Sequence, residues 1–449
     1  MTSANRLKIA IVTETHLPEV NGVSRSLDRM LKGIQDKGHE VITFRPAQPT
    51  DRASFWKLAM DSVSGLTPEQ RWLRDSSVAQ AFGRLEKSGI SARAKAEAVN
   101  PEEQQNPARQ HICMGLRMPF YKEVQVGLAS PHFFRSRFRK DRPDLVHLIT
   151  EGPLGLNALL AARSCGIPVI SDYRTHFDQY FSYYGMSRLG KAVAWYLRLF
   201  HNFTRRTLVP TREMKDELSS AGFKRVQVIG RGVDLQSYSP EHRDESLRIA
   251  YGVKGTAPLV LYAGRLAPEK NIDLAVAAFR EMQKVRSDAR MVLVGDGPER
   301  ARLEKENPDL TFTGFLSGAD LSVHYASSDI FLFPSLTDTF GNVVTEAAAS
   351  GLAVLAYDKG AAREILEDGL SARVVSQLEP GAYLQAAREM ARTSLDSLHG
   401  MRVQARQVAT AHDWEAIVDR LEDTYFDALV KKVRFRSLVQ NRMRKAQFQ

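Results

Sequence analysis

The sequence is poor in cysteine and has no long apolar run. Its 449 residues include two cysteines, Cys113 and Cys165, which form no metal-ligand pattern and allow at most one disulfide bond. So little cysteine fits a reducing compartment, and we expect a cytoplasmic protein. No run of about 18 apolar residues occurs, which argues against a membrane-spanning helix. The apolar run that begins at Leu7 meets polar residues at Thr13, too soon for the core of a signal peptide.

The excess of positive charge is modest. A formal net charge of +10 suits a partner that is an anionic small molecule, a nucleic acid or an anionic lipid surface. Cations are concentrated in residues 135–140 and in the tail over residues 431–445. The simpler interpretation of both segments is a solvated surface, and the sharper one is peripheral docking on the inner face of an anionic membrane. No nucleic-acid-binding motif is recognisable, so we expect no nucleic-acid partner.

Apolar strand patterns alternate with helical patterns in two series. The first series opens with a strand over residues 7–12, and the second begins after Pro258. Alternating strands and helices predict parallel sheets, so we expect an α/β protein with two doubly wound, Rossmann-like domains facing each other across a cleft. The predicted boundaries are 1–240, with an insertion at about 50–110, then 241–412, and then 413–449 for a last helix and basic tail.

The stretch over residues 338–346 leads from a predicted buried strand over 329–334 into a predicted alanine-rich helix over 343–350. The backbone amides that open such a helix form an anion site. Asp338 and Glu346 flank the turn, and carboxylates accept hydrogen bonds well from a sugar diol. The turn therefore suggests a nucleotide-sugar site, with ordinary surface acids as the simpler alternative for the two carboxylates.

Two cations follow the predicted strand over residues 259–263. Arg265 and Lys270 stand five residues apart between that strand and a helix, where they could clamp a diphosphate. A surface arginine and a surface lysine on a loop are the equally simple alternative.

Polar residues also follow the strands of the first series. Ligands bind at the carboxyl ends of strands in open parallel sheets. Glu151 and His176 lie at such ends, and a histidine in that place is as well explained by a catalytic or ligand role as by a structural one. Gly22 lies where a helix start could meet phosphate, although a plain turn explains it as well.

These motifs together resemble the retaining glycosyltransferases of family 4. The motifs stand in the family's order at residues 14–22, 150–153, 174–177, 264–271, 293–298, 333–335 and 338–346. The similarity omits residues 50–110 and the last 15 or so, and it is strongest to GDP-mannose-dependent α-mannosyltransferases and related glycolipid glycosyltransferases. It implies the GT-B fold, with the acceptor on the N-terminal domain, the nucleotide sugar on the C-terminal domain, and a last helix that crosses back to the first domain. Glu151 is the residue that we then expect to contact the acceptor.

The resemblance also implies a role for each residue of the donor site. The donor contacts would be Arg265 and Lys270 on the diphosphate, Gly22 and Gly264 against it, Glu346 on the ribose hydroxyls, and Asp338 with the amides of Phe340, Gly341 and Asn342 on the sugar. His176 would lie near the reacting face of the sugar, so the candidate catalytic residues are His176, Arg265, Lys270 and Asp338. The family pattern has glutamate at the first acid, and the shorter Asp338 changes the reach to the sugar hydroxyls.

The expected reaction transfers a hexose from a nucleoside diphosphate to a hydroxyl acceptor, which could be lipid-linked. Cations and a helix terminus can stabilise the leaving diphosphate, so we expect neither a metal nor another cofactor. GDP-mannose is the first candidate donor, followed by a UDP-sugar carrying glucose or glucuronate. The alternatives from other classes are a glycosidase that uses Asp338 and Glu346 as its acid pair, a nucleotide-sugar epimerase, and a non-catalytic sugar-binding module.

Overall fold

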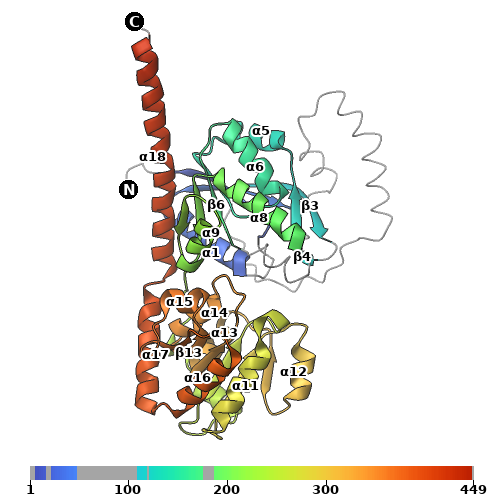
Figure 1. Cartoon of the computed structure of the whole chain (residues 1–449), viewed down its shortest axis with the longest axis vertical. Coiled ribbons are helices and arrows are strands. Elements are labelled where there is room, and N and C mark those ends of the chain that lie inside the picture. Colours follow the sequence, from blue (N-terminus) through green and yellow to red (C-terminus); the bar gives the residue numbers. More distant parts are fainter. Residues whose placement is uncertain (1–5, 17–21, 48–108, 119–120, 175–186, 447–449) are drawn as a thin grey trace, which may run out of the picture. The chain divides into compact units, whose positions relative to one another are not determined.

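The computed structural model describes residues 6–16, 22–47, 109–118, 121–174 and 187–446. His176 and nearly all of the predicted insertion at 50–110 lie outside these residues. The chain divides into two compact units, each built around its own sheet (Figure 1). The first unit comprises Met1–Val209, Leu218–Gln227 and Leu421–Gln449, and the second comprises Pro210–Glu217 and Val228–Arg420.

The described strands of the first unit form one eight-stranded sheet. Its order is β4-β3-β2-β1-β5-β6-β7-β8. The strands are β1 (Lys8–Val12), β2 (Glu40–Pro46), β3 (Arg109–Met118), β4 (Tyr121–Leu128), β5 (Leu145–Leu148), β6 (Val169–Asp172), β7 (Arg206–Val209) and β8 (Val226–Val228). Neighbours from β3 to β7 pair in parallel, and β4 pairs antiparallel with β3. The sequence does not predict β3 and β4, because their mixed polar pattern becomes a strand only beside a distant partner, β2.

Helices cover both faces of the first sheet. The helices of this unit are α1 (Gly22–Asp36), α5 (Pro131–Asp141), α6 (Pro153–Ser164), α8 (Ser187–Asn202), part of α9 (Arg212–Ser220) and part of α18 (Trp414–Ala446). Alternate strand residues face opposite sides. Ala10 and Val12 accordingly pack in one core with α5 and α6. On the opposite face, the Tyr425 hydroxyl of α18 lies 3.0 Å from Nδ1 of His147 on β5.

The last helix belongs to both units. Its residues through Arg420 are grouped with the second unit, and those from Leu421 onward with the first. The helix does not end before the predicted basic tail at 431–445, because α18 continues to Ala446. Neither proline nor glycine interrupts residues 414–446, so the chain carries no signal to end the helix earlier.

The second unit has a six-stranded sheet of order β11-β10-β9-β12-β13-β14. The strands are β9 (Leu259–Ala263), β10 (Arg290–Val294), β11 (Thr311–Gly314), β12 (Ile330–Phe333), β13 (Ala353–Tyr357) and β14 (Ala372–Val375), all paired in parallel. The helices are α10 (Glu245–Ala250), α11 (Ile272–Gln283), α12 (Arg300–Glu306), α13 (Gly318–Ser327), α14 (Asn342–Ala349), α15 (Gly360–Ile365), α16 (Pro380–Arg392) and α17 (Leu395–Thr410). The first five strands were predicted from their apolar runs, and β14 was not.

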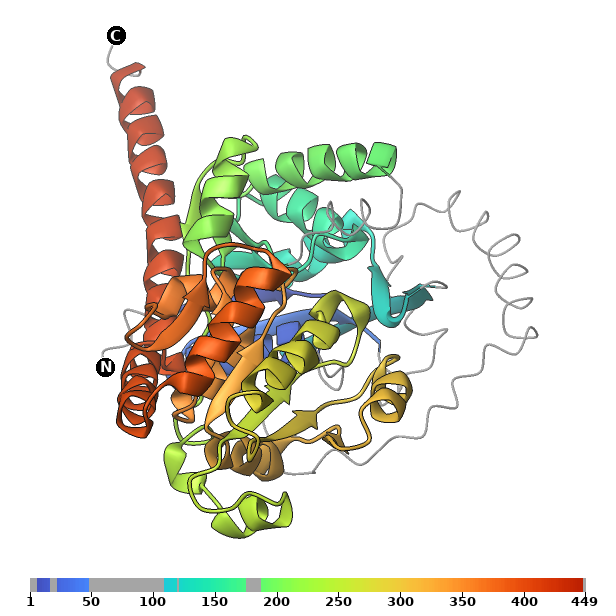
Figure 2. The ribbon, with the colours of Figure 1, turned by 60° about the horizontal axis from the view of Figure 1, so that its bottom comes forward.

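The second sheet is also covered on both faces. Helices α11 and α16 pack side by side over one face, as Figure 2 shows, and share a core that includes Phe279 and Tyr383. Helices α13, α14 and α15 pack on the other face with Tyr325 and Phe340 in their core. Two parallel sheets with helices on both faces confirm the predicted α/β class of two doubly wound domains.

The buried carboxylate of Glu14 lies just after the end of β1 in the first unit. Glu14 is 8% exposed, and its Oε1 accepts hydrogen bonds from the amides of Gly127 (3.0 Å) and Leu154 (3.4 Å). A Cβ on Gly152 would lie 1.9 Å from Oε2 of Glu14, so a side chain at position 152 would displace this carboxylate. Burial raises the pKa of Glu14 to about 7, against the lowering effect of the two amides.

This pKa predicts a pH-dependent stability that Glu14→Gln should remove. The carboxyl binds a proton more tightly in the folded chain than in the unfolded chain, whose value is near 4.5. The free energy of unfolding should therefore fall as the pH rises from about 4.5 to about 7, by at most about 3 kcal/mol. Denaturant titrations of both proteins across this range measure the difference. The exposed Glu415→Gln serves as control, and equal pH slopes for wild type and Glu14→Gln would contradict the assignment.

Candidate functional site

Two glycine-containing loops lie back to back at the carboxyl ends of β9 and β10. The amide of Gly264 donates to the carbonyl of Val294 (3.0 Å), and the amide of Leu266 donates to the carbonyl of Asp296 (2.9 Å). Gly295 has a φ of 141°, and a Cβ there would lie 1.9 Å from the carbonyl oxygen of Gly264. Glycine is thus required for the two loops to approach this closely, and the approach fixes the backbone that carries Arg265.

A second pair of loops is joined at the ends of β9 and β12. After a short 3₁₀ turn, Pro268–Lys270, Asn271 adopts a left-handed conformation with a φ of 54°. Its side-chain amide donates to the carbonyl of Pro334 (3.3 Å), and the hydroxyl of Thr337 donates to the carbonyl of Glu269 (3.1 Å). These bonds bring together residues more than 60 positions apart in the sequence.

Lys270 and Asp338 form an ion pair across these two loops. The Lys270 Nζ donates to Oδ1 of Asp338 at 2.6 Å, and each side chain is 22% exposed. The other carboxylate oxygen, Oδ2, is buried and has no hydrogen-bond donor among the described residues. Burial, and then the negative charge of Asp338, raise the pKa of the nearby Tyr262 hydroxyl. The site therefore holds a partly neutralised carboxylate with one oxygen unsatisfied.

The turn from Asp338 to α14 packs closely against β12 and is hydrogen-bonded to the start of α15. Gly341 has a φ of 85°, and a Cβ there would lie 3.1 Å from the ring of Phe333. Phe340 is buried, and its carbonyl accepts from the amide of Ala361 (2.6 Å) at the start of α15. The predicted strand-to-helix turn is present, and α14 begins at Asn342, one residue before the predicted start.

Glu346 lies on α14, one turn after Asn342. Its Oε2 accepts a hydrogen bond from the hydroxyl of Tyr325 (3.1 Å) on α13. The Tyr325 ring is fully buried, packs against Tyr238 and Phe331, and has a pKa well above the ordinary tyrosine value because of burial and the neighbouring Glu346. The sequence gives no signal for this contact, because Tyr325 looks like any core residue of an amphipathic helix.

The predicted residues of the first unit occupy strand and helix ends there. Gly22 is the first residue of α1. Glu151 is only 6% exposed, and its Oε1 lies 3.2 Å from Nε2 of His201, while its carbonyl accepts from the hydroxyl of Tyr196. The structure thus gives Glu151 protein partners, and its predicted contact with the acceptor stays a prediction. The predicted role of His176 concerns a residue outside the described part of the chain.

Two family descriptions match the chain in succession. Glycosyltransferase Family 4 matches residues 20–237, and Glycosyl transferases group 1 matches residues 257–393. The GDP-mannose-dependent alpha-mannosyltransferase of Mycolicibacterium smegmatis is 30% identical over 420 residues, which cover 93% of this chain and 97% of that protein. This chain belongs to glycosyltransferase family 4.

Other relatives of this glycosyltransferase are named after different sugars. The sulfoquinovosyl transferase SQD2 of Arabidopsis thaliana is 29% identical over 70% of this chain and 62% of its own length. The alpha-monoglucosyldiacylglycerol synthase of Streptococcus pneumoniae is 24% identical over 81% of this chain and 74% of its own length. Because the chain belongs to a family of glycosyltransferases, this class replaces the glycosidase, epimerase and binding-module alternatives.

The fold of the glycosyltransferase is also that of solved structures. The Anabaena protein HepE, solved with UDP and glucose, superposes with a TM-score of 0.63 at 17% identity, over 94% of this chain and all of that one. The sucrose-phosphate synthase of Thermosynechococcus elongatus superposes with a TM-score of 0.66 at 15% identity, over 95% of this chain and all of that one. The predicted GT-B fold is confirmed.

Two structural features are absent from the described residues, a metal-ligand cluster and a membrane-spanning helix. These residues contain no group of three or more histidine, cysteine, aspartate or glutamate residues arranged to hold a metal ion. Among the same residues, no helix is both long and apolar enough to cross a membrane.

Proposed function

We propose that this glycosyltransferase transfers a hexose, with mannose from GDP-mannose as the first candidate, to a hydroxyl acceptor with retention at the anomeric carbon. The observation that carries the proposal is the match to a GDP-mannose-dependent alpha-mannosyltransferase along nearly the whole length of both chains. The second candidate donor is a UDP-sugar carrying glucose or glucuronate. The glucosyldiacylglycerol and sulfoquinovosyl names among the relatives favour keeping this alternative.

Arg265 and Lys270 hold the diphosphate of the donor in this proposal. Both lie on the loop after β9, whose backbone is hydrogen-bonded to the loop after β10. Lys270 donates to Asp338, and a lysine ammonium has three hydrogens, so it can keep this bond and still contact a phosphate oxygen. Gly22 and Gly264 lie against the diphosphate, and stabilisation of its growing negative charge lowers the barrier to bond cleavage. No metal is required for that charge, and none is proposed.

Asp338 and the opening of α14 hold the transferred sugar. The unsatisfied Oδ2 of Asp338 costs free energy while it is buried without a donor, so a sugar hydroxyl that reaches it gains a hydrogen bond and relieves that cost. The amides of Phe340, Gly341 and Asn342 contact the sugar as well. Because aspartate is one methylene shorter than the glutamate of the family pattern, the hydroxyl pattern that fits here differs from that of relatives with glutamate.

Glu346 accepts hydrogen bonds from the ribose, and His176 lies near the reacting face of the sugar. A phosphate oxygen of the leaving group takes the proton of the acceptor on the same face, which gives retention without an enzyme nucleophile. The acceptor is a glycolipid or a saccharide bound by the first unit, with Glu151 near it. A relative named for a diacylglycerol product supports a lipid acceptor.

A panel of donors tests this proposal directly. GDP-mannose should release GDP faster than UDP-glucose or UDP-glucuronate releases UDP, and a diacylglycerol or saccharide acceptor should accelerate the release. Excess EDTA should leave the rate unchanged, and NMR of the product should show the α-anomer retained. The absence of nucleotide release from every donor would refute the transfer reaction, whereas strict dependence on a divalent cation would refute only its metal independence.

The diphosphate clamp predicts a loss of turnover without a loss of fold. Arg265→Ala and Lys270→Ala should each lower kcat by about 100- to 1,000-fold, because each removes charge that stabilises the leaving group. Steady-state rates with the best donor of the panel measure the effect. Lys305→Ala, an exposed lysine on α12, is the matched control and should be unchanged. Near-normal rates in either clamp variant, with circular dichroism like that of wild type, would contradict the clamp.

The contact between Tyr325 and Glu346 predicts a defect in donor binding. Tyr325→Phe removes one hydrogen bond to Glu346 and keeps the packing of the ring, so KM for the donor should rise about three- to tenfold with little change in kcat. The 2′-deoxyribose analogue of the donor should show a smaller rise, because it has already lost a hydroxyl partner of Glu346. An equal rise for both donors would place the effect of Tyr325 elsewhere than at the ribose.

A further inference from the structure

Three helices of the first unit carry cations almost without acids. Helices α5, α6 and α8 cover one face of the first sheet and share its core. They contain four, one and three lysine or arginine residues respectively, and one acid, Asp141. Asp141 is buried and bonds to Arg109 (2.8 Å) and His111 (2.7 Å), so these three helices present no carboxylate at their outer surface. The outer surface of these three helices therefore carries cations without carboxylates.

The same layer exposes large apolar side chains. Trp195, Leu199 and Phe203 recur every four residues along α8 and the turn after it, and they are 58%, 41% and 45% exposed. Residues four apart lie on one face of a helix, so the three side chains form a stripe. Leu160 on the neighbouring α6 is 51% exposed. A soluble protein rarely leaves a tryptophan, a phenylalanine and two leucines exposed together without a partner for them.

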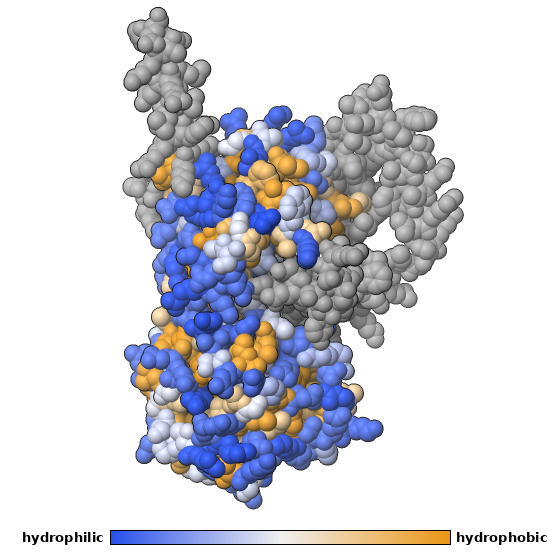
Figure 3. All heavy atoms as spheres, in the orientation of Figure 1, coloured by the Kyte–Doolittle hydropathy of each residue, from blue (hydrophilic) through white to orange (hydrophobic). Residues whose placement is uncertain are grey.

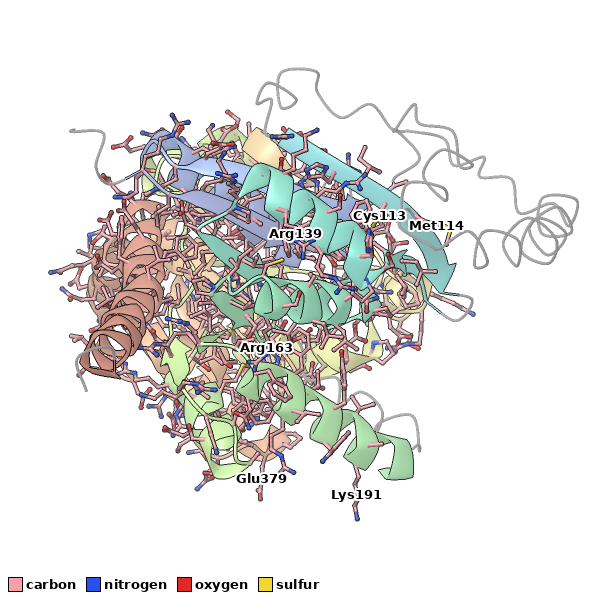
Figure 4. All side chains as sticks on the ribbon, turned by 90° about the horizontal axis from the view of Figure 1, so that it is seen from above. Cys113, Met114, Arg139, Arg163, Lys191 and Glu379 are labelled. Carbon is pink, nitrogen blue, oxygen red and sulfur yellow. The ribbon has the colours of Figure 1, made fainter. Side chains whose placement is uncertain are left out.

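Arg163 joins α6 to the end of this stripe. Its Nη1 donates to the carbonyl of Phe203 (3.0 Å), and its guanidinium lies 4.8 Å from the centre of the Phe203 ring. Figure 4 labels one cation on each of the three helices: Arg139 on α5, Arg163 on α6 and Lys191 on α8, one turn before Trp195. In Figure 3, hydrophobic atoms lie among hydrophilic ones on the side where Figure 1 draws α6 and α8.

We propose that the outer face of α6 and α8, with its stripe of Trp195, Leu199 and Phe203, docks the protein on the surface of an anionic lipid bilayer. Tryptophan prefers the boundary between lipid headgroups and acyl chains, and leucine and phenylalanine insert at the same depth. The surrounding cations attract anionic headgroups. A second copy of this chain fits less well, because two faces that carry cations without carboxylates repel each other. A nucleic acid would leave the two leucines without a partner.

This surface differs from the basic tail at 431–445, and it does not depend on the proposed donor or acceptor. It would hold the first unit, which we propose to bind the acceptor, at the membrane where a lipid acceptor resides. A wild-type protein that turns over the donor but does not bind the vesicles would overturn the docking surface alone. Normal vesicle binding without turnover would overturn the proposed function alone.

Vesicle co-sedimentation of the full chain tests the proposal. The protein should bind vesicles of phosphatidylglycerol and phosphatidylcholine in equal parts, and bind vesicles of phosphatidylcholine alone far more weakly. The double variant Trp195→Gln, Leu199→Gln should lose about tenfold or more in affinity for the mixed vesicles, because two apolar side chains no longer leave water. The matched control is Ile249→Gln, Val403→Gln, which changes two apolar residues of the second unit that are 71% and 50% exposed and should bind as wild type does.

The cations are tested in the same assay. Arg139→Gln, Lys191→Gln should weaken binding by about fivefold for each cation removed, and added salt should reduce this difference. Lys254→Gln, Lys305→Gln removes two exposed cations of the second unit and should have no effect. Binding that is lost equally in both charge pairs would reflect net charge alone and would overturn the assignment of the surface.

Tryptophan fluorescence locates the contact. Brominated lipids should quench the emission of the wild type, and Trp195→Phe should keep vesicle binding but lose most of this quenching. Unchanged vesicle binding by Trp195→Gln, Leu199→Gln would overturn the proposal. Self-association in the absence of lipid would also overturn the proposal if it depends on protein concentration and the same variant abolishes it. That result would assign the face to a second copy of the chain.

Discussion

The proposed donor site depends on how closely the loops at the strand ends can approach one another. Gly295 allows the backbone after β10 to touch the carbonyl of Gly264, and Gly360 does the same for the carbonyl of Phe340, where a Cβ would lie 2.5 Å away. Such contacts leave no room for any side chain. They hold the backbone of the β9 loop and of the turn before α14 in fixed positions. Arg265, Lys270 and Asp338 lie on this tightly packed backbone, and the proposed stabilisation of a leaving group requires such fixed charges.

The ion pair of Lys270 and Asp338 links the two chemical tasks of the site. Lysine is a compact cation with three hydrogens, so one bond to the carboxylate leaves it able to contact phosphate. Aspartate reaches Lys270 with one oxygen and keeps the other buried and without a donor among the described residues. A group that is buried and unsatisfied costs stability, and bound ligand is a natural source of the missing donor. In the proposed function, the same side chain thus orients a cation of the diphosphate clamp and offers an acceptor to the sugar.

The first unit uses buried polar groups in a different way. Glu14, Glu151 and His147 lie at or near the ends of central strands, and each is held by protein partners. Buried carboxylates and imidazoles are stable only when such partners exist. These contacts connect the strand ends to α8 and, through Tyr425, to the last helix. The polar chemistry of this unit is largely internal, whereas its outer helices combine exposed apolar residues with cations.

The sequence determined the fold class, most strands and the membership of the site in the second unit. Apolar runs identified the first five strands of the second sheet, because buried parallel strands are continuously apolar. The positions of Arg265, Lys270, Asp338 and Glu346 after or near those strands followed from the same pattern, since carboxyl ends of parallel strands share one edge. The family resemblance supplied their roles, and geometry alone could not have done so.

Only the tertiary structure decided which of these groups touch. The 2.6 Å contact of Lys270 with Asp338 and the hydrogen bond from Tyr325 to Glu346 join residues on different elements, and no local pattern encodes such pairs. Strands β3 and β4 also escaped prediction, because a polar strand is stabilised by its neighbours in the sheet and not by its own composition. The stripe on α8 is likewise invisible in sequence, where an exposed face and a buried face of a helix show the same spacing of apolar residues. Periodicity reports that a helix has an apolar side, and only packing reveals whether that side is covered.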